Sequence, residues 1–112
     1  MRAIKTRRQL MKVSNYLETE PTEEVPGSLK REVITAKDGA PNFAMRVIEV
    51  KPGGSSPFHT HPWEHEVFIL SGQAVVKGEQ GETEIAKDSV IYIAPEEKHC
   101  FVNKGNEPLR FV

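Results

Sequence analysis

All four histidines of this chain fall into one spacing pattern that is typical of metal ligands. His59, His61 and His65 lie within seven residues of one another, and His99 follows much later in the sequence. Imidazole nitrogen is the commonest protein ligand for transition metals. Taken singly, each histidine would more often be a surface or core residue. The cluster together with the distant histidine indicates one mononuclear metal site per chain.

Strand geometry explains how these side chains could reach one ion. Residues two apart in an extended strand point to the same face, so His59 and His61 can approach one metal together. Pro62 bends the chain, and His65 returns to the same side if the link after Pro62 is kinked. His99 would have to enter from a later strand, and a closed barrel brings such distant strands together.

The histidine set narrows the choice of metal without fixing it. Neutral imidazoles suit Mn, Fe, Co, Ni, Cu or Zn, and the usual affinity order does not select among these ions. In an octahedral site with four histidines, one or two positions stay open for water, dioxygen or a chelating substrate. A closed tetrahedral site would instead indicate structural zinc. No catalytic residue or general base can be named from the sequence.

Composition excludes several classes of function. The chain has 112 residues, which is a single-domain length, and a formal net charge of -1. This charge balance does not require nucleic acid or an anionic membrane. No apolar run approaches the roughly 20 residues that span a bilayer, and the basic N-terminus lacks the apolar segment of a secretory signal. A single cysteine, Cys100, fits a reducing cytoplasm. We therefore expect a cytoplasmic protein that binds a small molecule, not nucleic acid or membrane.

The chain divides into a polar N-terminal part and a strand-rich remainder. Residues 1–30 are predicted to be a tail with a possible edge strand at residues 11–17, and residues 31–112 are predicted to form a β-barrel domain. We expect residues 1–10 to be a frayed tail; a basic arm that binds an anion is the weaker alternative. The chain stops at Val112 inside a predicted strand. Either the native chain continues, or this strand pairs with another subunit.

Short apolar or alternating segments separated by turn-forming residues fill the sequence after residue 30. No segment there has a convincing helical period. Such a pattern predicts an all-β sandwich or closed barrel. The predicted strands cover residues 31–35, 43–50, 67–70, 73–77, 82–86, 90–93, 99–103 and 109–112.

From about residue 40 to residue 112 the sequence resembles the cupin superfamily. The match to the first cupin motif consists of Gly53, His59, His61, Glu66 and Gly72. The match to the second motif consists of Pro95, His99 and Asn103, whereas Asp88 and Glu97 stand where glycines are usual. The resemblance implies a double-stranded β-helix, the jelly-roll barrel of cupins, and usually a homodimer.

The position of the glutamate in the first cupin motif indicates a closer resemblance to one subgroup of the family. His65 stands at the earlier of the two positions available to that glutamate, and Glu66 stands at the later one. The stretch 61–68, preceded by residues 40–43, resembles small single-domain bacterial cupins of the cupin 2 type. In that subgroup four histidines hold one metal, often manganese. The resemblance therefore implies that Glu66 is only the runner-up ligand, that manganese is favoured, and that the ligands are His59, His61, His65 and His99.

These observations lead to one leading functional hypothesis and two alternatives. The leading hypothesis is a manganese- or iron-dependent oxidoreductase of dioxygenase type that acts on a small molecule. The first alternative is a non-catalytic cupin that binds or senses a small molecule, because a fold alone does not decide function. The second alternative is a structural metalloprotein, in which the metal stabilises the barrel. The substrate and the reaction stay open.

Overall fold

The computed structural model describes residues 11–112, which form antiparallel strands and two single-turn 3-10 helices. The helices are η2 (Tyr16–Glu18) and η3 (Ala36–Asp38). The strands are β1 (Thr22–Val25), β2 (Ser28–Ile34), β3 (Met45–Val50), β4 (His65–Ser71), β5 (Gln73–Gly78), β6 (Gly81–Ala86), β7 (Val90–Ile93), β8 (His99–Val102) and β9 (Leu109–Phe111). The all-β prediction is therefore confirmed.

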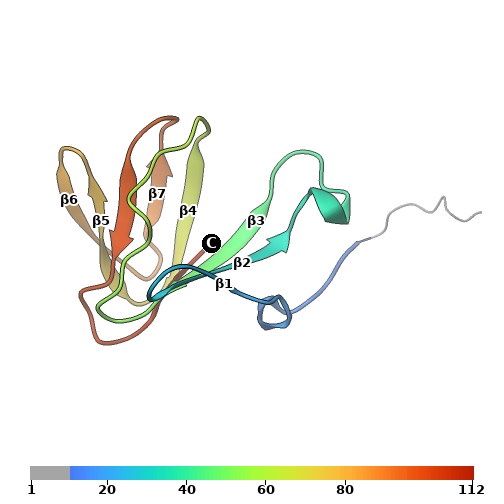
Figure 1. Cartoon of the computed structure of the whole chain (residues 1–112), viewed down its shortest axis with the longest axis horizontal. Helices are drawn as coiled ribbons and strands as arrows, with labels where there is room; N and C mark the ends of the chain where they lie inside the picture. The colour runs from blue at the N-terminus through green and yellow to red at the C-terminus, as the bar shows by residue number, and fades with distance from the viewer. Residues whose placement is uncertain (1–10) are drawn as a thin grey trace, which may run out of the picture.

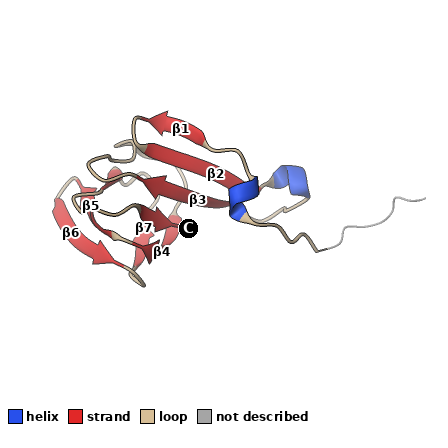
Figure 2. Ribbon diagram, turned by 90° about the horizontal axis from the view of Figure 1, so that it is seen from below, coloured by secondary structure: helices blue, strands red, loops and turns tan. Residues whose placement is uncertain are grey.

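The strands form two sheets that face each other across the core. One sheet has six strands in the order β1-β2-β3-β9-β4-β7, and the other has three in the order β6-β5-β8. Neighbouring strands in space are often distant in sequence, as when β9 pairs with both β3 and β4. This topology confirms the predicted jelly-roll barrel. The hairpin of β2 and β3 projects beyond the barrel, with η3 at its tip (Figure 1). Figure 2 shows β1, β2 and β3 lying side by side.

The core lies between the two sheets and follows the alternation of the strands. Ile69 on β4 and Leu109 on β9 are completely buried, and the rings of Phe101 and Phe111 meet edge to face at 4.3 Å. On β4 the alternation that places Ile69 inside also places Phe68 outside, where it is 40% exposed. The same alternation turns the side chain of His65, four residues before Ile69, toward the inside of the barrel.

Several strand boundaries differ from the prediction, and the strand predicted for residues 31–35 begins at Ser28. The segment 11–17 forms no strand, because Asn15 caps η2 by accepting a hydrogen bond from the Leu17 amide at 2.9 Å. The edge strand is β1 instead, so the sheet begins at Thr22. The strand predicted for residues 43–50 begins only at Met45. The predictions for residues 1–10 fall outside the described part of the chain.

The segment around η2 packs against the outer face of the large sheet. The hydroxyl of Tyr16 accepts a hydrogen bond from Arg110 at 2.8 Å, and the guanidinium of Arg31 lies over the Tyr16 ring at 5.6 Å. These contacts cover β2 and β9 on the side away from the barrel interior. Within residues 11–112, none of the helices has the length and apolar character that crossing a bilayer requires.

Two motif residues hold the barrel together at a distance from the histidines. Gly72, at the turn from β4 to β5, has φ +94°, and a Cβ there would lie 2.6 Å from the backbone oxygen of Pro108. Asn103 is 1% exposed, and its amide donates to the carbonyls of Val50 at 2.9 Å and Glu107 at 2.8 Å. Gly72 therefore permits a close backbone approach, whereas the side chain of Asn103 ties two backbone segments together.

Candidate metal centre

A direct backbone pairing joins the two parts of the sequence that carry the histidines. The amide of His99 donates to the carbonyl of His59 at 3.0 Å, and the amide of His59 donates back at 3.2 Å. Pro57 and Pro62 flank this short extended segment, and neither can donate a ladder hydrogen bond. His59 therefore pairs with His99, at the beginning of β8, through an isolated β-bridge. This bridge brings residues forty positions apart into contact.

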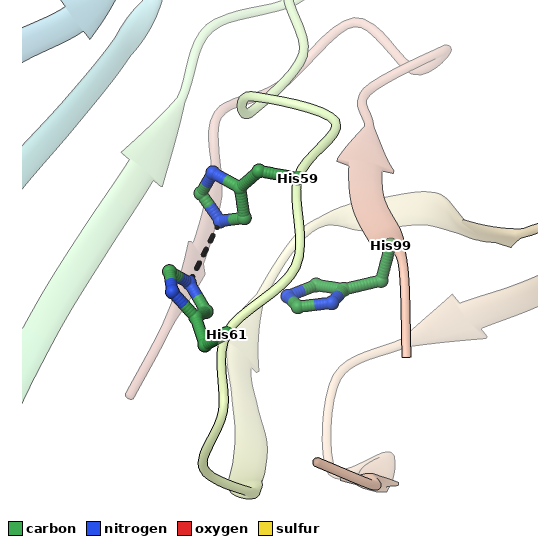
Figure 3. Close-up of side chains that lie close together, drawn as sticks. All are labelled: His59, His61 and His99. Carbon is green, nitrogen blue, oxygen red and sulfur yellow. Dashed lines mark hydrogen bonds between the residues drawn. The ribbon is translucent and has the colours of Figure 1, made fainter. Parts of the chain in front are cut away.

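Three of the four predicted ligands converge at this bridge. The Nε2 atoms of His59 and His61 lie 3.0 Å apart, and Figure 3 shows the ring of His99 reaching from its own strand toward the segment that carries them. One nitrogen from each of His59, His61 and His99 lies within 4.8 Å of the others. Because His59 and His61 are two residues apart, both rings project from the same side of the segment, as the sequence predicted.

A backbone carbonyl fixes the orientation of His99. Its Nδ1 lies 2.8 Å from the oxygen of Glu97, and because a carbonyl can only accept, Nδ1 carries the proton. The Nε2 atom of a neutral His99 ring is then left with a free lone pair. A ligating histidine typically has this arrangement, with its second nitrogen donating to a carbonyl. His99 is 7% exposed, so the ring has little freedom to turn.

His65 lies beside this group but is not part of it. Its ring centre is 5.0 Å from that of His61 and 5.5 Å from that of His99. Its Nδ1 contacts the Nη2 atom of Arg46 at 3.5 Å, the upper limit of a hydrogen bond. The structure therefore brings three of the four histidines together, and coordination by His65 stays a prediction.

Glu66, the runner-up ligand, points away from the histidines. It lies opposite Tyr92 on β7, and both side chains are exposed on the outer face of the sheet. Its hydrogen bond with the neighbouring carboxyl group of Glu64 raises the pKa of Glu66. The alternation along β4 that brings His65 inside is the reason that Glu66 is outside.

The surroundings keep the histidine rings in the neutral form that binds metals. Burial lowers the pKa of His59, His61 and His65, and for His65 it falls to about 4. The neighbouring histidines and the positive charge of Arg46 lower all three pKa values further, and the carboxylate of Glu24 partly offsets this for His59 and His61. At neutral pH these rings therefore present lone pairs, and a metal ion would not have to displace protons from them.

The geometry and the donor set fit a transition metal. Two imidazole nitrogens at about 2.1 Å from one ion, in neighbouring positions about 90° apart, are separated by about 3 Å. The Nε2 atoms of His59 and His61 are 3.0 Å apart. Imidazole donors suit the divalent ions from manganese to zinc better than calcium or magnesium, which prefer oxygen. The identity of the metal is not determined by this donor set.

Three charged side chains flank the cluster, one each on β1, β2 and β3. Arg46 on β3 contacts His65, whereas Lys30 on β2 forms an ion pair with Glu24 on β1 at 3.1 Å. The sequence alone gave no reason to place Lys30 and Glu24 beside the histidines. Only the register between β1, β2 and β3 could have revealed them.

The only tryptophan of the chain stacks on one of the converging histidines. The ring planes of Trp63 and His61 are 9° from parallel, with their centres 4.9 Å apart. Trp63 is also 54% exposed, so one face of its ring packs on the site while much of the side chain meets solvent. Trp63 therefore lies between His61 and solvent.

This chain matches one family model and is similar in structure to several known proteins. Residues 46–112 match the family model Cupin_2, described as a cupin domain. The polyketide cyclase RemF from Streptomyces resistomycificus superposes with a TM-score of 0.82 at 31% identity, covering 91% of this chain and 76% of that one. A cupin 2 domain-containing protein from Halorhodospira halophila superposes with a TM-score of 0.70 at 32% identity, covering 80% and 64%.

A curated relative is similar over most of this chain. The tetracenomycin polyketide synthase protein TcmJ of Streptomyces glaucescens is 27% identical over 93 residues, which are 82% of this chain. The match spans only 62% of the length of TcmJ. The relative is therefore longer than the region that the two proteins share.

Proposed function

Because the chain belongs to the cupin family, we propose that it is a metal-dependent enzyme acting on a small molecule. One divalent transition metal per chain, with manganese favoured, would be held by His59, His61, His65 and His99. When bound, the ion would supply a Lewis acid with an open position and, for manganese or iron, redox chemistry. The observation that carries the proposal is the convergence of His59, His61 and His99, whose nitrogens lie within 4.8 Å of one another.

The chain's own residues support a site that binds a substrate rather than one that only stabilises the barrel. His65 and Arg46 meet at 3.5 Å on the inner side of the large sheet, so a polar surface adjoins the cluster. Trp63 offers a partly exposed aromatic ring that stacks on His61. A purely structural site would not require a cation and an exposed aromatic ring beside the ligands.

For the reaction, we propose oxidation of dioxygenase type as the leading class. The predicted ligands are all neutral imidazoles, so no carboxylate would offset the charge of the ion, and the redox metals manganese and iron accept such ligands. Glu66, the only carboxylate with a ligand-like sequence position, is outside the site. The protein would position the substrate and exclude water from the cluster.

Metal-assisted cyclisation of a polyketone is a second candidate. It is favoured by the 31% identity with the polyketide cyclase RemF and by the similarity to TcmJ. In that reaction a polarised carbonyl group is attacked by a carbon atom of the same substrate, and no oxidant is consumed. A non-catalytic binding or sensor protein and a structural metalloprotein are the remaining alternatives.

One set of assays separates these functions. The protein, purified without a histidine tag or added metal, is loaded with manganese or iron and offered phenols, diketones and alkenes while dioxygen consumption is recorded. Oxidative turnover that is lost in His99→Ala and kept in Glu66→Ala supports the leading class. Turnover of a polyketone without dioxygen supports cyclisation instead. Saturable binding without any turnover would contradict both enzymatic proposals and favour a sensor.

A further inference from the structure

The side chain of Arg46 enters the candidate site without a carboxylate partner of its own. Within residues 11–112, no carboxylate oxygen lies within 4.0 Å of its guanidinium, and the four ion pairs there involve other residues. Its cross-strand neighbour Glu32 is exposed and makes none of these ion pairs. A half-buried guanidinium without a counter-ion is costly, because its five N–H donors need acceptors.

The position of Arg46 directs this charge toward the histidines. On β3 the side chains alternate between the two faces, so Arg46 lies on the same face as Ile48 and Val50, which pack in the core. Its Nη2 atom contacts His65, and its charge is felt at His59 and His61 as well. Arg46 is therefore part of the site rather than of the solvent-facing surface.

The other charged groups nearby do not neutralise Arg46. Lys30 and Glu24 form their own ion pair at 3.1 Å, and together they carry no net charge. Glu64 and Glu66 interact with each other on the outer face, and Glu97 uses its carboxylate to accept from the Ala94 amide at 3.0 Å. A divalent ion held by neutral histidines would add two positive charges to that of Arg46. The site would then be strongly cationic.

The contact between Arg46 and His65 also indicates that a negatively charged group belongs beside Arg46. If His65 binds a metal through Nε2, its Nδ1 carries the proton, as in the tautomer that His99 already adopts. The guanidinium of Arg46 has donors only. The two groups would then face each other as donors at 3.5 Å, with no acceptor between them. An oxyanion placed beside Arg46 would accept its hydrogen bonds and offset its charge.

From this charge balance we infer that the site selects a small organic oxyanion, a carboxylate or an enolate, and that Arg46 is the residue that binds it. This inference rests on the proposed function, since it names the substrate class of the same site. It applies equally to oxidation and to cyclisation, because both act on oxygen-bearing substrates that can carry a negative charge. Arg46 would determine which molecules bind, whereas the histidines would hold the metal.

The test is calorimetric titration of zinc-loaded and metal-free protein with charged and neutral probes. Malonate represents carboxylates, malonamide is its uncharged analogue, and acetylacetone represents enolates. We expect malonate or acetylacetone to bind the wild type at least about 10-fold more tightly than Arg46→Gln, an effect typical of losing one charge-assisted pair. Malonamide should bind both proteins equally. Arg46→Lys, which keeps the charge, should retain part of the affinity.

Matched controls separate this effect from a general loss of charge or of folding. Arg31→Gln removes the same charge from the neighbouring strand, but Arg31 contacts Tyr16 and Glu49 instead of the histidines. It should bind the probes as the wild type does. Circular dichroism and zinc content are measured on every variant. If Arg46→Gln does not fold, Arg46→Lys takes its place in the comparison with the wild type.

The outcomes distinguish this inference from the proposed function. Equal affinity of the wild type and both Arg46 variants for malonate and for acetylacetone would overturn the inference even when zinc is bound normally. Absence of metal from the wild type would overturn the proposed function, while a dependence on Arg46 in the metal-free titration would still support an oxyanion site. Whichever charged probe shows the dependence identifies the substrate as a carboxylate or an enolate.

Discussion

The Nδ1 atom of His99 donates a hydrogen bond to the backbone carbonyl of Glu97 over 2.8 Å. This single contact fixes both the orientation and the proton of the ring, so that its Nε2 faces His59 and His61. Since Glu97 lies in the turn before β8, the position of the ligand depends on the backbone of that turn.

We expect His99→Ala to lower the affinity for the metal by more than about 100-fold, because it removes a ligand with a preset orientation. His65→Ala should also weaken binding if His65 is the fourth ligand. Elemental analysis of protein purified without added metal measures the metal content per chain. Glu66→Ala is the matched control, and it should keep the metal of the wild type because Glu66 faces outward. Loss of metal in Glu66→Ala but not in His65→Ala would show that the fourth ligand is Glu66 and not His65.

The metal-free protein should become less stable as the pH falls from about 6.5 to about 4. Burial, followed by the charge of Arg46, lowers the pKa of His65 from 6.5 to about 4. Between these values the unfolded chain takes up a proton that the folded protein does not, so the free energy of unfolding falls with pH. The lowered pKa values of His59 and His61 act in the same direction.

Urea unfolding of the metal-free protein at several pH values measures this dependence. The slope of the free energy of unfolding against pH reports the protons taken up on unfolding. In His65→Asn this slope should be smaller by up to one proton. A wild type and His65→Asn with the same dependence between pH 4 and 6.5 would show that the pKa of His65 is not lowered by folding.

Gly72→Ala should destabilise the protein by more than about 2 kcal/mol, because a clash adds to the conformational strain. The new Cβ would lie 2.6 Å from the Pro108 oxygen and 2.9 Å from the Cα of Leu109, both of which are backbone atoms. Gly53→Ala is the matched control. Its φ of +83° gives a similar strain, but nothing lies within 4 Å of the added Cβ. Equal changes in the free energy of unfolding for both variants would show that the close approach at Gly72 has no energetic weight.

Asn103→Ala should lower the free energy of unfolding by roughly 2–4 kcal/mol. The side chain makes hydrogen bonds with backbone groups of Val50, Gly105 and Glu107, and the buried carbonyl of Val50 would lose its side-chain donor. Denaturant unfolding gives the value, and Asn106→Ala, at an exposed position in the same loop, should change it by less than about 0.5 kcal/mol. A cost for Asn103→Ala as small as that of the control would rule out this role.

We also propose that the chain forms a homodimer. The outer face of β4 and β7 carries Phe68, Val90 and Tyr92, which are 40%, 76% and 61% exposed, and β7 is at an edge of its sheet. Burying such a face against a second copy would remove apolar surface from water. Sedimentation equilibrium should give twice the mass of the chain, and Val90→Asp should shift it toward the monomer. Val13→Asp, at another exposed apolar position, should leave the mass unchanged. A monomeric wild type would refute this proposal.

The sequence by itself determined most of the strand pattern and pointed to three histidines that the structure brings together. Alternating apolar residues and turn residues predicted β4 to β9 within a few positions, because period-2 burial is a local property of each strand. The same alternation placed His65 inside and Glu66 outside. The spacing of His59 and His61 predicted that they share a face, since two residues make one repeat of an extended chain. In contrast, the N-terminal edge strand was misplaced, because the cap at Asn15 competes with strand formation there.

Only the tertiary structure decided which distant groups meet. The bridge between His59 and His99 and the carbonyl that orients His99 depend on the pairing of segments forty residues apart. His65 on β4 contacts Arg46 on β3, although β9 separates these two strands in the sheet, and the group of three contains only His59, His61 and His99. Such contacts depend on strand register and sheet order, which are set by the packing of the whole barrel and not by the residues next to each histidine.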